Sequence, residues 1–182
     1  MTYKKLIVWI LLWVWLFTLG SAWGEIELSR EYTVKAAILF NFGKFVEWPP
    51  ESFKNEASPL VIGIVGADPF GAVFDAVKDK TVKGRKPVFR KLPRLENFED
   101  CHILFISRSE KGNLRPLLAA AKNYNILTVS DIDRFAEQGG MIGLVPGENT
   151  IVFEINLDTV QRSKLKVSSQ LLKLAKIIQG AP

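Results

Sequence analysis

Between residues 30 and 47 the chain repeats apolar side chains at the three- and four-residue spacing of one helix face. The repeated positions are Val34, Ile38, Phe42, Phe45 and Val46. Ser29 can accept a hydrogen bond from a free amide at the start of such a helix, and Pro49 with Pro50 prevents its continuation. The pattern therefore predicts a long helix over residues 30–47.

Uninterrupted apolar runs follow, and runs of this length are typical of strands covered on both faces of a sheet. The clearest run occupies residues 60–65, buried strands are also predicted over residues 101–107 and 126–129, and a further strand is expected over residues 87–91. Helical spacing separates them, first after Asp68 and Pro69, which favour a helix start, and again over residues 114–124. This order of elements is typical of a parallel sheet with helices on its faces.

The pattern changes after residue 130. Asp131 is a candidate cap for a short helix that ends at Gly139 and Gly140. Two strands over residues 141–145 and 150–155 then flank a four-residue turn, which predicts an antiparallel hairpin on the edge of the sheet.

Two further helices are expected near the end of the chain, capped by Asn156 and Ser168. The core face of the last helix is predicted to contain Leu171, Leu174, Ala175 and Ile178. We therefore predict a single α/β domain over residues 25–182, with a mostly parallel central sheet, flanking helices and a C-terminal antiparallel edge hairpin.

Residues 1–24 have the pattern of a secretory signal peptide. Two lysines precede an apolar run over residues 6–19, which is shorter than the roughly 20 residues that cross a bilayer. Small residues allow cleavage before Glu25, or alternatively before Trp23. An uncleaved membrane anchor is the other possibility, and either one places the domain outside the cytosol.

Composition removes several classes of function. The 182 residues contain one cysteine and one histidine, Cys101 and His102, which excludes an intramolecular disulfide and any metal or catalytic site with two imidazoles. The net charge of +5 includes the two lysines of residues 1–24 and falls to +3 without them. The basic balance of an exported chain is therefore weak support for nucleic-acid binding, and we expect none.

Familiar catalytic motifs are absent from the sequence. The loop over residues 66–71 follows a predicted strand, but it lacks the lysine and hydroxyl residue of a phosphate-binding loop and the glycine spacing of a dinucleotide site. His102 begins the strand that Ser107 ends, so the two are expected at opposite ends of the sheet and cannot form a catalytic pair. We predict that the protein is not an enzyme, with no catalytic residues, metal or cofactor.

Polar residues follow two predicted parallel strands, where ligands bind in open α/β sheets. These candidate ligand-binding residues are Ser107, Arg108, Ser109, Ser130 and Asp131. Capping of the next helices explains the same residues equally well. The first helix has more apolar surface than one face requires, so Phe42, Phe45 and Trp48 are candidates for a partner-binding surface or, alternatively, for full burial.

Basic residues are concentrated between positions 78 and 94, where Asp79 is the single acid. The basic positions are Lys78, Lys80, Lys83, Arg85, Lys86, Arg90, Lys91 and Arg94. They are interpreted either as a solvated turn and edge strand protected by charge, or as a docking patch for an acidic partner or anionic head groups.

Five blocks of sequence, in order and with similar spacing, resemble the YfiR family of exported bacterial proteins. The blocks are residues 31–49, 61–71, 101–109, 127–131 with 139–142, and 153–157 with 168–172. The resemblance covers about residues 30 to 178. It departs from better-known members in its cysteines, because they have paired cysteines whereas Cys101 has no intrachain partner.

The resemblance implies a periplasmic α/β protein, often a homodimer, that represses a membrane diguanylate cyclase by binding its periplasmic part or acts on another sensor. It also implies an outer-membrane lipoprotein partner that sequesters the repressor, which frees the cyclase to make cyclic di-GMP and promote biofilm growth. The leading hypothesis is therefore a periplasmic regulator acting through protein contacts. The alternative is a periplasmic small-molecule receptor that signals to a membrane sensor.

Overall fold

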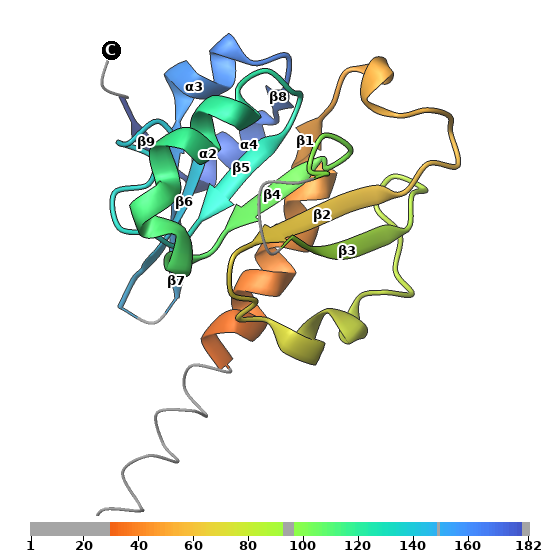
Figure 1. Cartoon of the computed structure of the whole chain (residues 1–182), viewed down its shortest axis with the longest axis horizontal. Helices are drawn as coiled ribbons and strands as arrows, with labels where there is room; N and C mark the ends of the chain where they lie inside the picture. The colour runs from red at the N-terminus through yellow and green to blue at the C-terminus, as the bar shows by residue number, and fades with distance from the viewer. Residues whose placement is uncertain (1–29, 93–96, 149, 180–182) are drawn as a thin grey trace, which may run out of the picture.

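In the computed structural model of the protein, which describes residues 30–92, 97–148 and 150–179, the main sheet has seven strands in the order β3-β2-β4-β5-β6-β7-β9 (Figure 1). The strands are β2 (Leu60–Val65), β3 (Pro87–Leu92), β4 (Ile103–Ile106), β5 (Leu127–Ser130), β6 (Ile142–Pro146), β7 (Ile151–Asn156) and β9 (Lys176–Ile178). The five strands from β3 to β6 are parallel to one another, and β7 is antiparallel to β6. The predicted α/β fold with a mostly parallel sheet is confirmed.

Alternate side chains of the central strands enter two separate cores. In β4, Ile103 and Phe105 belong to one buried cluster and Leu104 and Ile106 to the other. Every residue of β2, β4 and β5 is buried, as the uninterrupted apolar runs predict for strands covered on both faces. The sheet is therefore the middle layer of three.

Helices cover both faces (Figure 1). The N-terminal helix over residues 30–45 packs on one face with the 3₁₀ helix η2 (Gly71–Ala76), α3 (Leu157–Arg162) and α4 (Ser169–Leu174). The 3₁₀ helix η3 (Arg108–Asn113) leads into α2 (Leu114–Ala121), which packs on the other face. Asn156 and Ser168 cap α3 and α4 by accepting hydrogen bonds from backbone amides at 2.9 and 3.2 Å, as predicted.

Two predicted helices end earlier than expected because the residues that follow them pair as strands. The N-terminal helix ends at residue 45 because Val46–Glu47 forms a short strand, β1, that pairs antiparallel with β8 (Lys166–Val167). The last helix ends at Leu174, whose side chain is 70% exposed, so the prediction of a helix to Ile178 was wrong. Residues 176–178 instead form β9, which pairs with β7 and moves the hairpin one strand in from the edge.

At two further positions the structure does not have the α-helix that the sequence predicts. Asp68 accepts hydrogen bonds from the amides of Phe70 and Gly71, but the turns that follow are 3₁₀ rather than α-helical. Residues 133–139 form turns rather than the helix expected after Asp131. The carboxylate of Asp131 contacts side chains instead of capping a helix.

No helix within the described residues is long and apolar enough to cross a membrane. The predicted signal peptide, residues 1–24, lies outside the part of the chain that the structure describes. Its export role therefore stays a prediction.

Candidate functional site

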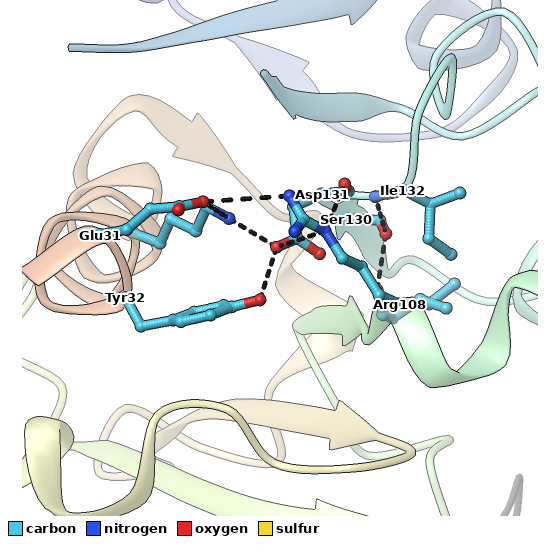
Figure 2. A network of polar contacts seen from close by, with 8 residues as sticks. Glu31, Tyr32, Arg108, Ser130, Asp131 and Ile132 are labelled. Carbon is cyan, nitrogen blue, oxygen red and sulfur yellow. Dashed lines mark hydrogen bonds and ion pairs between the residues drawn. The ribbon is translucent and has the colours of Figure 1, made fainter. Parts of the chain in front are cut away.

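The carboxyl ends of β4 and β5 lie beside the first turns of the N-terminal helix, and five charged or phenolic side chains meet there (Figure 2). Glu31, Tyr32 and Lys35 come from the helix, where spacings of three and four residues place them on one face. Arg108 follows β4, and Asp131 follows β5. We call these five residues the buried ion network.

Asp131 is the centre of the buried ion network. Its Oδ2 atom lies 2.5 Å from Lys35 Nζ and accepts a hydrogen bond of 2.9 Å from the hydroxyl of Tyr32. The side chains of Lys35 and Asp131 are both fully buried. Lys35 also forms an ion pair with Glu31, and its Nζ lies 4.4 Å from the ring centre of Tyr32. Burial of these charges is tolerable because each has an opposite partner.

Arg108 links the buried ion network to solvent. Its Nε donates to the Asp131 carbonyl oxygen at 3.2 Å and lies 3.3 Å from Asp131 Oδ2. A terminal nitrogen of the guanidinium is 3.9 Å from Glu31 Oε1, beyond hydrogen-bond distance. The side chain is 49% exposed, so an external acceptor can reach its outer N–H groups.

The second carboxylate oxygen of Asp131, Oδ1, is buried and has no hydrogen-bond partner among the described residues. Such an atom retains the capacity to accept a hydrogen bond. Burial, followed by the hydrogen bond to Asp131, raises the pKa of the Tyr32 hydroxyl, so Tyr32 stays protonated and donates. The arrangement therefore encloses Oδ1 and offers donors to a ligand through the exposed N–H groups of Arg108.

The three candidate serines have structural contacts near this edge. Ser130 Oγ donates to the Ile106 carbonyl at 2.6 Å and accepts from the Ile132 amide at 3.0 Å. Ser109 Oγ accepts a hydrogen bond from the Ala67 amide, which joins the loops after β2 and β4. Ser107 is buried, and its backbone amide donates to Val65. Of the predicted ligand-binding residues, the structure brings Arg108, Ser130 and Asp131 together, whereas Ser109 lies toward β2.

The apolar candidates lie at the other end of the N-terminal helix. Phe42 is 1% exposed and contacts Phe153 edge-to-face, with ring centres 5.9 Å apart. Phe45 and Trp48 are partly buried against the same core, and Trp48 Nε1 donates to the carbonyl of His102 at 3.0 Å. The structure therefore places Phe42 inside the core and leaves only partial exposure at Phe45 and Trp48.

Sequence reasoning missed the helix side of the buried ion network. Lys35 interrupts an apolar series, because Tyr32, Leu39 and Phe42 at helical spacing from it are all buried. A lysine on the buried face of a helix requires a buried acid. That signal was present in the sequence, although it does not identify Asp131 as the partner.

His102 lies at the amino end of β4, opposite the end that Ser107 follows. Its Nδ1 accepts from the Val61 amide at 3.1 Å, and Nε2 contacts the Ser52 carbonyl at 3.1 Å, so the ring is neutral with its proton on Nε2. A cavity of about 440 Å³ beside His102 and Cys101 is at this amino end, away from the buried ion network. The described residues contain no group of three or more potential metal ligands.

A family model described as YfiR/HmsC-like matches residues 32–176, a range that includes six of the seven strands of the main sheet, the first residue of β9, and four of the five residues of the buried ion network. The family name implies a YfiR-type regulator. The match extends over most of the chain. The protein therefore belongs to the YfiR/HmsC-like family.

Proposed function

We propose that this protein is a periplasmic regulator that represses an inner-membrane diguanylate cyclase by direct contact, and so limits cyclic di-GMP and biofilm growth. The observation that supports this function is membership of the YfiR/HmsC-like family across residues 32–176. Export through the signal-peptide pattern of residues 1–24 is part of the proposal.

Repression of this kind requires the protein to bind one conformation of the cyclase more tightly than the other. About 1.4 kcal/mol of preference changes the ratio of the two conformations tenfold. The ion pair between Lys35 and Asp131 attaches the N-terminal helix to the sheet, which favours docking as a rigid body. We therefore propose that the degree of repression depends on the amount of protein bound to the cyclase, and that the protein catalyses no reaction.

Two further partners belong to the proposal. A second copy of the chain forms a homodimer, and an outer-membrane lipoprotein competes with the cyclase for the repressor. Sequestration by the lipoprotein lowers the free concentration of repressor, which relieves repression by mass action.

The direct test is a titration of the purified protein against the periplasmic domain of each membrane diguanylate cyclase encoded in its genome. One domain should bind saturably. The corresponding full-length cyclase, reconstituted in membranes, should lose activity in proportion to the protein bound. Failure of every such domain to bind would refute the proposed function.

A second candidate function is a receptor for a small polar molecule, and the half-exposed guanidinium of Arg108 favours it. The buried Oδ1 atom of Asp131 has no hydrogen-bond partner among the described residues, beside the half-exposed guanidinium of Arg108. A thermal-shift screen would identify a ligand by a rise in Tm that disappears in Arg108→Ala. The control Arg115→Ala changes an exposed arginine outside the buried ion network and should keep the rise.

A further inference from the structure

A hollow of about 400 Å³ lies beside the carboxyl end of the N-terminal helix, at the amino end of β2. Its buried apolar lining includes Val46, Leu60 and Val82, each no more than 2% exposed. Trp48 and Phe53, both partly buried, also line it, together with the exposed side chain of Glu47. An apolar hollow of this size, with aromatic side chains, is suited to a bulky apolar group.

A strained turn borders the hollow. Val82 and Arg85 exchange backbone hydrogen bonds of 2.8 and 2.9 Å across Lys83 and Gly84, whose φ angles are +50° and +79°. Two-residue turns with positive φ at both positions favour Asn-Gly, and a lysine in this conformation costs about 1 kcal/mol. Backbone strain of this kind is concentrated at functional positions. The geometry of the turn does not favour lysine at position 83, so we look for a functional reason for its positive charge.

The two cations of this turn are held in place but not neutralised. Lys83 Nζ donates to the Val46 carbonyl at 3.0 Å. Arg85 donates to three backbone carbonyls, those of Asn55, Glu56 and Ser58, at 2.7–3.0 Å. Within the residues that the structure describes, neither cation has a carboxylate within ion-pair distance. Carbonyl oxygens orient a cation but leave its charge uncancelled, and the two cations outnumber Glu47, the one acid in the lining, so this edge of the hollow has a net positive charge.

The surrounding chain increases this charge. Residues 78–86 contain five basic side chains and one acidic one. Lys80, Lys83 and Lys86 are all exposed. A positive edge around an apolar hollow is complementary to an acidic segment that presents an apolar side chain.

We infer that this hollow and its basic edge form the docking site for an acidic segment, bearing a bulky apolar side chain, on the membrane protein that the chain regulates. This inference rests on the proposed function and assigns its contact surface. The apolar side chain enters the hollow, which Trp48 and Phe53 line, and carboxylates of the same segment face Lys83 and Arg85. Arg and Trp are enriched among residues that dominate interface energies, in agreement with this assignment.

The most informative variant is Lys83→Asn, because asparagine tolerates positive φ while the charge and its hydrogen bond to the Val46 carbonyl are removed. Its Tm should equal or exceed that of the wild type. Its affinity for the periplasmic domain of the regulated cyclase should fall about five- to tenfold, and its dependence on salt concentration should weaken, because an edge charge chiefly affects electrostatic association. Part of the affinity should persist in high salt through the apolar side chain.

Arg134→Asn is the matched control. Arg134 is another cation at positive φ, +58°, but it pairs with Glu137 at 2.6 Å and does not line the hollow. The control should bind like the wild type.

The outcomes separate the two claims. If no cyclase domain binds the wild type, the proposed function and the assigned occupant both fail. If a domain binds and Lys83→Asn binds it equally well, the docking site is wrong while the function stands. Loss of binding to phosphatidylglycerol vesicles in Lys83→Asn, with domain binding unchanged, would assign the basic edge to lipid and overturn the inference.

Discussion

Lys35 and Asp131, 96 positions apart in the sequence, form an ion pair of 2.5 Å in which both side chains are fully buried. Removing one partner leaves a buried charge with less compensation. We therefore expect Asp131→Ala and Lys35→Met each to lower the free energy of unfolding by about 3 kcal/mol or more. Urea denaturation of the two variants measures this directly.

The double variant Lys35→Met/Asp131→Leu should recover part of that loss, because apolar side chains replace both charges. Lys164→Met is the comparison, since Lys164 pairs with Glu51 at 3.1 Å and both side chains are exposed. That variant should lower the free energy of unfolding far less than either change in the buried pair, because solvent screens the charges of an exposed pair. If breaking the buried pair and breaking the exposed pair lowered the free energy of unfolding equally, burial would not be the reason that the Lys35–Asp131 pair matters for stability.

His102 makes stability depend on pH. Burial, as the largest cause, lowers the pKa of His102 below its ordinary value of about 6.5, and Nδ1 is already an acceptor for the Val61 amide. The unfolded chain therefore binds the proton more readily. Stability should be fully present above about pH 6.5 and should fall as the pH drops from there through the lowered pKa of His102.

This effect is measurable as Tm between about pH 7.5 and 5.5. His102 is the sole histidine of the chain, so His102→Gln should make the profile flatter in this range. A variant with the same slope as the wild type would assign the pH dependence to other groups.

Cys101 should be chemically inert in the folded protein. It is 3% exposed, and burial raises the pKa of its thiol to about 11. Thiolate is the reactive form, so a thiol reagent at pH 8 should label Cys101 at the rate of unfolding and far faster in denaturant. Rapid labelling of the native protein would show that Cys101 is accessible.

The sheet was predictable from sequence because its central strands are buried on both faces, which leaves uninterrupted apolar runs such as residues 60–65. Strand β9 was not predictable in the same way. Ile178 continues the helical spacing of Leu171 and Leu174, yet residues 176–178 pair with the open edge of β7. The unpaired hydrogen-bonding groups on the edge of β7 outweigh the local helical spacing. The spacing of apolar residues in one segment cannot show that such an edge is available elsewhere in the fold.

The candidate site also has one part that was predictable from sequence and one part that was not. Arg108 and Asp131 were predictable because residues that follow parallel strands meet at one edge of a sheet. Their contacts with Glu31, Tyr32 and Lys35 depend on how the N-terminal helix crosses that edge. A single helical pattern fixes which face is buried, not where along the sheet the helix lies.

The central claim is periplasmic repression of a diguanylate cyclase. The most direct measurement is cellular cyclic di-GMP in the native host, with and without the gene, complemented by the full chain or by a chain lacking residues 1–24. The account predicts a rise on deletion that only the full chain reverses. An unchanged level, or reversal by the chain that lacks residues 1–24, would contradict it.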